Sequence, residues 1–371
     1  MDNRFSRTRI LSHTPRKVSS MQGIPDEEIH IARNGAHSDS FRQEEGELGM
    51  TRRQLPSVSV VIPTRDRPEL LRGTLRSVSD QTLLPDEVIV VDDASSGDET
   101  RKVVEEFSSA SVRYVRHPEG KGQNATRNTG IGLAKGDLIA LLDDDDLWVP
   151  TKLEKQVPAF LRGADVGLVY CGTAGIDLAT KRVHDLGRRS YAEGDLYRRE
   201  LVRDVTASTS TYVVRRACFE EVGMFDETLS ARTDWDMVIR ISEKYRIACV
   251  PEVLVLSGTH SGARTSFDFP RVLEAFRLVF EKYASARRTM GRRVSLEAKA
   301  VFCYNLGAVY SRADSTWPWH LGPLHFLRGI FAWPFFVSNY VGLLKTFVPR
   351  PLRRWIRDLL LRWARAGGSG D

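Results

Sequence analysis

Four consecutive aspartates directly after an apolar run are the chemically most unusual feature of this sequence. Asp143–Asp146 follow Leu138–Leu142, a stretch typical of a buried strand. Neighbouring carboxylates repel one another and raise one another's pKa, and a divalent cation relieves that repulsion. Mg²⁺ and Mn²⁺ prefer oxygen ligands, and alternate residues of an extended chain point to the same side, so Asp143 and Asp145 are candidate metal ligands. The alternative is an acidic surface turn or a cap for the following helix.

Polar residues also end two other predicted strands. Pro63–Asp66 follow the apolar run Val58–Ile62, and Asp92–Ser95 follow Glu87–Val91. Ligands of open α/β sheets bind outside the carboxyl ends of the strands. We therefore expect Asp92–Ser95 and the four aspartates to face one crevice. The alternative role of Asp92–Ser95 is to form a turn and to cap the next helix.

The elements that must position these residues alternate between strand and helix. Apolar residues recur with a helical period at Leu71, Leu75 and Val78, and alternation continues to Leu142. The further predicted strands are Val112–Val115 and Asp137–Leu142, and the further helices are Glu99–Phe107 and Gln123–Ala134. Alternating elements with short links predict an α/β fold with a mainly parallel, Rossmann-like central sheet and helices on both faces.

A glycine-rich segment precedes the helix at Gln123–Ala134. Gly120–Ala125 fit the spacing of the dinucleotide fingerprint, which would indicate an NAD enzyme. That fingerprint requires a tight turn directly after the first strand, whereas Arg116–Glu119 separate this segment from a later strand. The fingerprint is therefore disfavoured here.

Five motifs in order resemble those of family 2 glycosyltransferases with the GT-A fold. They lie between Ser57 and Ser266, a little over half of the chain. They read V-S-V-V-I-P-T-R-D-R from Val58, V-I-V-V-D-D-A-S-S-G-D from Val88, G-Q-N-A-T-R-N-T-G from Gly122, L-L-D-D-D-D-L-W-V-P from Leu141 and T-D-W-D-M from Thr233. Each motif alone is weak, but the ordered set favours this family strongly.

The resemblance implies a nucleotide-diphospho-sugar donor and a divalent cation, Mn²⁺ or Mg²⁺. It places the donor at Pro63, Thr64, Asp66, Asp93, Gly122, Arg127, Asp143 and Asp144. It places the cation at Asp143, Asp145 and His260. An ordinary ion pair is the alternative for Arg127, and a purely structural role is the alternative for His260.

The resemblance assigns the general base to Asp234, which would take the proton from an acceptor hydroxyl. Many relatives have Glu-Asp-Trp at this point, whereas this chain has Thr233 at the glutamate position. The alternative for Asp234 is an N-cap of the helix that begins here.

The function that follows from the resemblance is inverting, metal-dependent transfer of a sugar to a glycan, lipid-linked or other hydroxyl acceptor. Synthesis of cell-surface polysaccharide or glycoconjugates is the expected setting. A nucleotidyltransferase, which would release pyrophosphate, and a non-catalytic sugar-nucleotide binding protein are the alternatives.

Composition sets the limits within which this interpretation stands. The chain has 371 residues, with 42% hydrophobic and 27% charged residues, values that exclude collagen-like, wholly disordered and polytopic membrane proteins. We expect a disordered tail over 1–55, a GT-A catalytic domain over 56–268 and a helical region over 269–371. The four cysteines have no metal-ligand spacing, which indicates buried thiols in a reducing, cytoplasmic compartment.

The helical region carries most of the basic excess. Helices are predicted at Arg271–Lys282 and Arg293–Tyr310, and no run in Leu321–Val348 reaches the length that spans a membrane. Leu352–Trp363 combines an apolar stripe with arginines on its other faces, which favours peripheral attachment to an anionic membrane surface. The alternative is packing on the catalytic domain or on a partner subunit. Nucleic-acid binding is disfavoured, because the arginines lie on an apolar helix instead of lining a groove.

Overall fold

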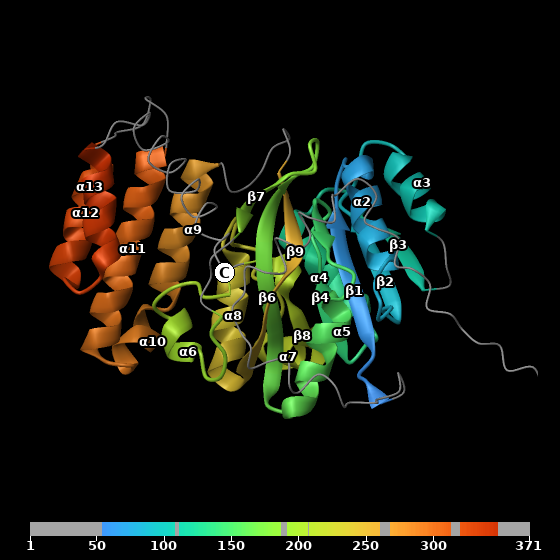
Figure 1. Ribbon diagram of the computed structural model, residues 1–371, viewed down its shortest axis with the longest axis horizontal. Coiled ribbons are helices and arrows are strands. Elements are labelled where there is room, and N and C mark those ends of the chain that lie inside the picture. The colour runs from blue at the N-terminus through green and yellow to red at the C-terminus, as the bar shows by residue number, and fades with distance from the viewer. Residues whose placement is uncertain are drawn as a thin grey trace, which may run out of the picture.

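One mixed sheet runs through the middle of the molecule (Figure 1). The computed structural model describes residues 54–107, 111–186, 191–206, 208–259, 268–312 and 320–347. Their strands are β1 (Val58–Thr64), β2 (Glu87–Asp92), β3 (Val112–Arg116), β4 (Leu138–Leu141), β5 (Asp146–Trp148), β6 (Val166–Asp177), β7 (Val183–Leu186), β8 (Val213–Arg215) and β9 (Arg246–Thr259). The order across the sheet is β3-β2-β1-β4-β8-β6-β9-β5, and β7 pairs with β6.

The strands that carry the predicted motifs form the parallel part of this sheet. β3, β2, β1 and β4 are mutually parallel, whereas β8 joins β4 and β6 in antiparallel pairs and β6 and β9 are parallel. Thr64 on β1 is level with Asp92 on β2. The predicted α/β fold is confirmed, and the parallel register brings the carboxyl ends of β1 and β2 to one edge.

The predicted end of the first strand is wrong, because the strand continues through Pro63. The sequence indicated that Pro63 ends the first strand, but β1 continues to Thr64 and Pro63 pairs with Val91 of β2. On its other side β1 pairs with β4 only from Val58 to Val61. Pro63 therefore lies beyond β4, where a residue without an N–H group is tolerated.

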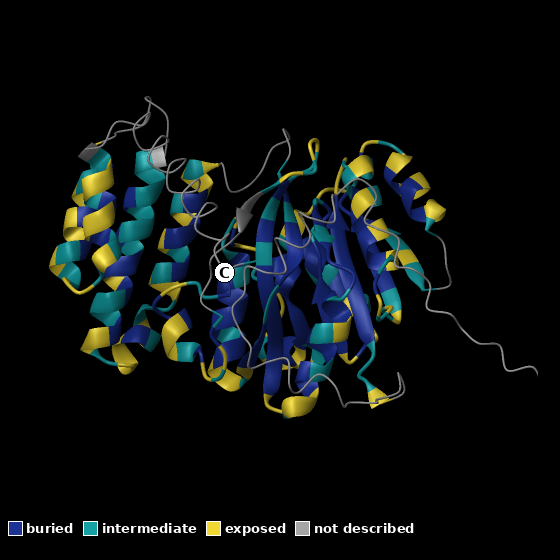
Figure 2. Ribbon diagram, in the orientation of Figure 1, coloured by how far each residue is buried: buried dark blue, intermediate teal, exposed yellow. Residues whose placement is uncertain are grey.

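Helices cover both faces of the sheet, and residues that alternate along each strand build two separate cores. The helices of this part are α2 (Pro68–Ser79), α3 (Glu99–Glu106), α4 (Gln123–Leu133), α5 (Lys152–Gln156), α6 (Tyr197–Glu200), α7 (Arg216–Val222) and α8 (Thr233–Lys244). Val60 and Ile62 face the core under α2, α3 and α5, and Val61 faces the core under α4, α7 and α8. The strands are accordingly buried along most of their length (Figure 2).

The remaining helices stack beside the sheet at the left of Figure 1. They are α9 (Phe269–Lys282), α10 (Ala284–Thr289), α11 (Arg292–Arg312), α12 (Leu321–Ala332) and α13 (Val337–Phe347). The two predicted helices of this region are confirmed by α9 and α11. Trp235 of α8 meets Phe276 of α9 edge to face, with ring centroids 6.3 Å apart, in a small core of its own. None of the described helices is long and apolar enough to cross a bilayer. Residues 1–53 and the predicted helix Leu352–Trp363 lie outside the described residues.

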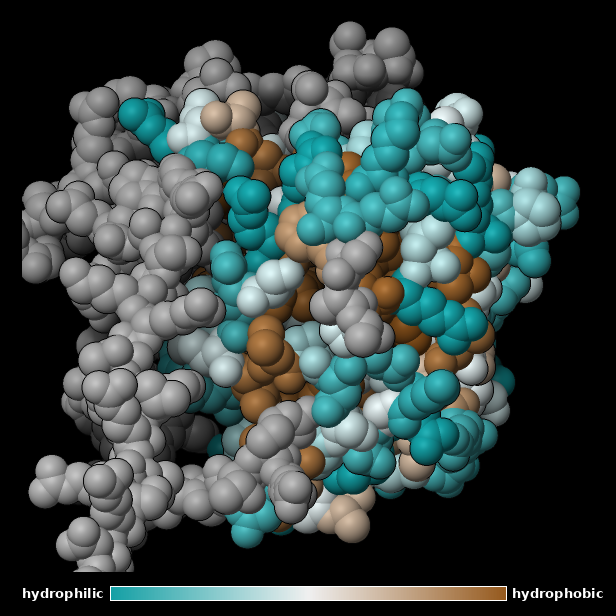
Figure 3. Space-filling view, turned by 90° about the vertical axis from the view of Figure 1, so that its right-hand side faces the viewer, coloured by the Kyte–Doolittle hydropathy of each residue, from teal (hydrophilic) through white to brown (hydrophobic). Residues whose placement is uncertain are grey.

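The opposite end of the molecule, shown in Figure 3, is the edge strand β3 with α2 and α3 beside it. Arg113 and Arg116 of β3 are exposed, whereas Val112, Tyr114 and Val115 are half-buried. Hydrophilic residues enclose smaller hydrophobic areas on the described surface visible here. Charged side chains on an edge strand discourage pairing with another sheet.

Candidate active site

A cavity of about 810 Å³ opens at the carboxyl ends of β1, β2 and β4. This volume lies in the range of ligand sites, about 300–1,000 Å³. Among the predicted site residues, those that line it are Pro63, Thr64, Asp93, Gly122, Arg127, Asp143, Asp144, Asp145 and Asp234. Segments that are far apart in the sequence therefore meet around one space, as their position after the strands predicted.

Asp93, at the end of β2, organises the glycine-rich segment. Its carboxylate accepts hydrogen bonds from the N–H groups of Lys121 at 2.7 Å and Gly122 at 2.9 Å. His117 Nδ1 lies 3.0 Å from it. Burial alone would raise the pKa of Asp93, but these three donors hold that pKa below its usual value. Asp93 is thus an anion whose position is fixed by the protein, at the wall of the cavity.

Asp92, its neighbour, has the structural role that sequence analysis gave as the alternative. It is fully buried and accepts hydrogen bonds from the N–H of Ser95 at 2.8 Å and from the hydroxyl of Tyr114 at 2.6 Å. It fixes the turn after β2.

Gly122 stands between this segment and α4. Its φ of +91° lies in the region that side-chain-bearing residues rarely adopt, and a Cβ there would meet no atom within 4 Å. The glycine is therefore required by the backbone conformation and leaves open space on the cavity side.

Arg127 of α4 is buried and forms an ion pair with Asp143. Its Nη2 lies 2.5 Å from Asp143 Oδ1, and its guanidinium lies over the ring of Phe225, 5.4 Å from the centroid. Its Nε has no hydrogen-bond partner. The ion pair is the alternative interpretation of this arginine, and contact with a phosphate stays a prediction.

The four aspartates form a turn, so the expected extended chain is not found. Asp146 N–H donates to Asp143 O at 3.2 Å, and the turn places Asp143 against Arg127 and Asp145 within 3.6 Å of Arg67. The expectation that alternate aspartates point to one side required an extended backbone, which the turn interrupts. All four still line the cavity.

Two of these carboxyls are crowded and poorly compensated. Burial raises the pKa of Asp144 to about 7; Arg67, whose Nη1 lies 3.2 Å from its carboxylate, lowers it, and Asp145 raises it further. Burial and the charges of Asp145 and Asp143 raise the pKa of Asp146 to about 7. Positive charge delivered to this turn would stabilise it.

The donor set fits a small hard cation that a substrate helps to bind. In the described part of the chain no three acidic, imidazole or thiol side chains gather closely enough to hold an ion by themselves. Mg²⁺ sites commonly use one or two carboxylates, and phosphates and water supply the other ligands. Asp143 and Asp145 provide such a pair at the cavity wall.

Asp234 lies across the cavity from this turn, in the first turn of α8. It is half-buried, and its Oδ1 accepts the N–H of Trp235 at 2.9 Å. The residue in the N-cap position is Arg232, whose φ is +57°, and no side chain caps the helix. The N-cap alternative for Asp234 is therefore wrong, and Asp234 is one of the residues that line the cavity.

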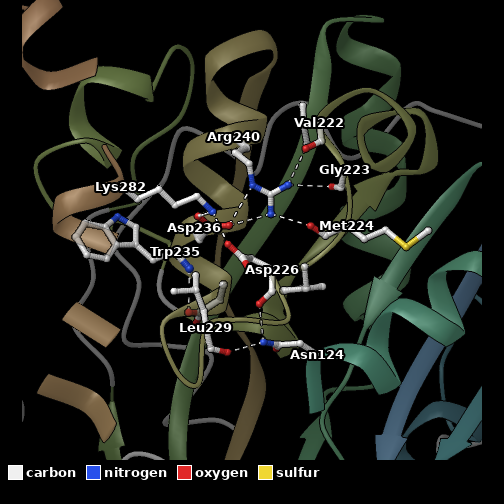
Figure 4. Close-up of polar contacts among 12 residues, drawn as sticks. Asn124, Val222, Gly223, Met224, Asp226, Leu229, Trp235, Asp236, Arg240 and Lys282 are labelled. Atoms are coloured by element: carbon white, nitrogen blue, oxygen red, sulfur yellow. Dashed lines mark hydrogen bonds and ion pairs between the residues drawn. The ribbon is translucent and has the colours of Figure 1, made fainter. Parts of the chain in front are cut away.

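Asp236, two residues later, anchors α8. It is fully buried; Arg240 Nη2 lies 2.9 Å and Lys282 Nζ 2.7 Å from its carboxylate, and the Tyr283 hydroxyl donates to it at 2.8 Å. Figure 4 shows how Arg240 reaches three backbone carbonyls, those of Val222, Gly223 and Met224. The network ties α8 to α9 and to the loop before it.

Three polar residues near the site were missed by sequence analysis. His117 and Arg67 follow strand β3 and strand β1, so their place at strand ends was a usable signal. For Glu200 the sequence offered no such signal. Glu200 is fully buried, and among the described residues its Oε1 has no hydrogen-bond partner. Its backbone carbonyl accepts the indole N–H of Trp235 at 2.9 Å.

One of the described predicted site residues does not line the cavity. Asp66 is exposed and accepts hydrogen bonds from Ser96 N–H at 2.6 Å and Ser96 Oγ at 2.7 Å, so it holds the loop after β2. His260 lies outside the described residues.

Comparison with known proteins gives sequence relatives over the same segment. Residues 59–223 match the family described as glycosyl transferase family 2. YwdF of Bacillus subtilis, named an uncharacterized glycosyltransferase, is 30% identical over 195 residues, 52% of this chain and 71% of that protein. WcaA of Escherichia coli, named a putative colanic acid biosynthesis glycosyl transferase, is 30% identical over 202 residues, 51% of this chain and 67% of that protein. WfgD of Escherichia coli, named a glucosyltransferase that takes UDP-Glc to GlcNAc-diphosphoundecaprenol, is 37% identical over 113 residues, 30% of this chain and 44% of that protein.

Solved structures share the fold. TarS 1-349 of S. aureus superposes with a TM-score of 0.54 and 15% identity, covering 78% of this chain and 89% of that one. This likeness confirms the predicted GT-A fold. Because the identity to YwdF extends over more than two thirds of that protein and the family match contains the residues of the acidic turn, the chain belongs to glycosyl transferase family 2 and is a glycosyltransferase.

Proposed function

We propose that this enzyme moves a sugar from a nucleotide-diphospho-sugar to a hydroxyl of a glycan or lipid-linked acceptor, with inversion at the anomeric carbon. The observation that carries the proposal is the single cavity that joins the acidic turn after β4 to Asp234 at the start of α8. The acidic turn offers oxygen ligands for a cation, and Asp234 offers a carboxylate that can accept a proton.

The donor half of the cavity is built by β1, β2 and α4. The nucleoside would lie by Pro63, Thr64 and Asp93, where Thr64 is already oriented by a 2.8 Å hydrogen bond to Asp144. Gly122 leaves room for the diphosphate, and Arg127 offers charge close to it. A Mn²⁺ or Mg²⁺ ion held by Asp143 and Asp145 would supply the positive charge that stabilises the departing diphosphate.

Asp234 would act as the general base. Its carboxylate takes the proton of the acceptor hydroxyl as that oxygen bonds to the anomeric carbon. The bond from this carbon to the diphosphate breaks, and its electron pair leaves with the nucleoside diphosphate. Because attack comes from the face opposite the leaving group, the configuration inverts.

Release of nucleoside diphosphate, followed by a luminescent assay over a panel of donor sugars, tests this proposal. Asp234→Asn should lower the turnover number by about 10²-fold or more, since a general base contributes about 10²–10⁴-fold. Asp98→Asn, an exposed aspartate away from the cavity, is the matched control. If Asp234→Asn turned over at the rate of the control, the proposed role of Asp234 as the general base would be refuted.

Synthesis of cell-surface polysaccharide or glycoconjugates is the biological role that we propose. The names of WcaA and WfgD, which refer to colanic acid and to a diphosphoundecaprenol-linked sugar, support it.

We further propose peripheral attachment to the cytoplasmic face of a membrane. The connection between α12 and α13 and the helix ends that it joins expose Phe331 by 85%, Phe335 by 78% and Val337 by 67%, and Leu344 of α13 is exposed by 67%. Residues 321–347 contain no acidic side chain and two basic ones. Aromatic and basic groups together suit an anionic lipid interface.

The four cysteines, Cys171, Cys218, Cys249 and Cys303, are free and buried, which suits a reducing compartment.

Flotation with phosphatidylglycerol vesicles tests the attachment. The double variant Phe331→Ser, Phe335→Ser should float less than the parent, whereas Leu84→Ser, an exposed leucine in the catalytic part, should float equally well. Equal flotation of all three proteins would contradict the proposed contact of Phe331 and Phe335 with the membrane.

A further inference from the structure

The end of the cavity beyond Asp234 is lined by two arginines, Arg232 at the N-cap of α8 and Arg271 of α9. Ser230, Ala231 and Arg232 form one wall, and Arg271 from the first turn of α9 forms the other. Arg271 belongs to α9, one of the helices that stack beside the sheet, whereas β1 and β2, which build the donor half, lie toward the opposite end of the sheet (Figure 1).

The side chain of Arg271 is held in place through one nitrogen of its guanidinium group. Its Nε donates to the carbonyl of Ser230 at 2.7 Å. In the described part of the chain no carboxylate lies within 4.0 Å of its guanidinium, while Arg277, two turns further along α9, pairs with Glu274 at 2.8 Å. At the rim of the cavity, the two terminal nitrogens of Arg271 thus form no ion pair with the described carboxylates.

Arg232 is fixed beside it at a conformational cost. Its backbone adopts φ +57°, which is unfavourable for a residue with a Cβ and recurs at functional sites. Its guanidinium lies over the ring of Phe276, 4.3 Å from the centroid, and its Nη1 lies 3.5 Å from Asp204. Asp204 therefore partly neutralises Arg232, whereas no described carboxylate forms an ion pair with Arg271.

The loop that carries Arg232 and contacts Arg271 is rigidly supported. Asn124 Nδ2 donates to the carbonyls of Asp226 at 3.0 Å and Leu229 at 2.8 Å, and Lys282 Nζ lies 2.6 Å from Asp226 Oδ2 (Figure 4). Through Ser230 this loop also positions Arg271. The two guanidinium groups are therefore preorganised with respect to Asp234.

We propose that Arg271, assisted by Arg232, binds a phosphate or diphosphate group of the acceptor and so presents the acceptor hydroxyl to Asp234. A guanidinium fork matches the oxygens of a phosphate in two parallel hydrogen bonds. Glu227 also lines the cavity, but its carboxylate accepts from Asn128 of α4 at 2.8 Å, toward the donor half. This inference rests on the proposed function and names the chemical class of its acceptor.

Calorimetric titration of the full-length protein, with a saturating nucleoside diphosphate and Mn²⁺ occupying the donor half, tests the inference. The probes are farnesyl diphosphate, inorganic pyrophosphate and farnesol. We expect farnesyl diphosphate to bind and Arg271→Ala to weaken it by about tenfold or more, because both hydrogen bonds of the fork are lost. Arg271→Lys should retain part of the affinity, and the control Arg277→Ala all of it.

The outcomes separate the sources of the anion and the two proposals. Pyrophosphate that binds as tightly as farnesyl diphosphate, with the same loss in Arg271→Ala, identifies the phosphate group alone as the ligand. Binding that is absent from the parent, equal in Arg271→Ala or equally strong for farnesol overturns the inference. Failure of every nucleoside diphosphate to stabilise the parent against heat would instead refute the donor site, and an unchanged nucleotide shift in Arg271→Ala shows that its fold and donor half are intact.

Discussion

Lys282 Nζ lies 2.7 Å from Asp236 Oδ1, which joins the last turn of α9 to the helix that carries Asp234 (Figure 4). Asp236 is fully buried, and Arg240 is its second cationic partner. The placement of α8 thus depends on a side chain from the C-terminal helical region.

Removal of the shared carboxylate should therefore destabilise the protein strongly. Asp236→Ala removes the buried carboxylate that Arg240 and Lys282 share. The expected loss in the free energy of unfolding is about 3 kcal/mol or more, as for other broken buried ion pairs. Urea unfolding measures it. Glu274→Ala, which breaks the exposed pair with Arg277, should cost less than about 1 kcal/mol. Equal losses in the two variants would contradict the anchoring role of Asp236.

Replacing Gly122, just before α4, and Gly132, within α4, by alanine should change the stability of the protein in opposite directions. Gly122 has a φ of +91°, so Gly122→Ala should destabilise by about 1–2 kcal/mol although a methyl group has room. Gly132 is exposed within α4 at ordinary contact distance from Met224, so Gly132→Ala should stabilise by up to about 1 kcal/mol. Thermal unfolding of both variants checks the pair, and a stabilised Gly122→Ala protein would argue against the backbone requirement.

The sequence allowed prediction of the parallel half of the sheet, because its strands and helices carry regular apolar periods and its polar residues stand at strand ends. Val58–Ile62 and Leu138–Leu142 are buried on both sides, as such runs require. Asp93 and Asp143 therefore line one cavity as expected, whereas Asp234 was assigned by the family resemblance alone.

The partners of these residues could not be predicted, since they depend on contacts between distant segments. The turn at Asp144 and the three-residue strand β5 are too short to leave a period in the sequence. Glu200 lies beneath Trp235 only because α6 packs on α8, and its sequence surroundings resemble an ordinary exposed helix.

Loss of one carboxylate from the acidic turn should raise stability and abolish turnover. Asp145 raises the pKa of both Asp144 and Asp146, so Asp145→Ala removes repulsion and should increase the free energy of unfolding by about 1 kcal/mol. The same change removes a proposed metal ligand, and sugar transfer should disappear. Chelation by EDTA should stop transfer in the parent, and Mn²⁺ should restore it. An Asp145→Ala protein with parental turnover would eliminate this aspartate from the metal site.

The buried carboxyl of Glu200 should make stability depend on pH in a way that glutamine removes. Burial, followed by the charges of Asp204 and Asp234, raises the pKa of Glu200 well above its usual value. The folded state therefore binds this proton more tightly than the unfolded state, whose glutamate pKa is about 4.3. Stability from this group is complete below that value and is lost as the pH rises through the folded pKa.

Glu200→Gln stays neutral at every pH and keeps the shape of the acid. Relative to the parent, the variant should gain about 1 kcal/mol or more in the free energy of unfolding between pH 5 and pH 8, because only in the parent does the unfolded state release this proton more readily than the folded state. Urea titrations at the two pH values measure the difference. Glu220→Gln, an exposed glutamate of α7, should show no comparable gain. If the Glu200→Gln and parental proteins changed in parallel with pH, Glu200 would have to be ionised already at the lower pH, and its carboxylate would need a partner among the polar groups of α6 and α8.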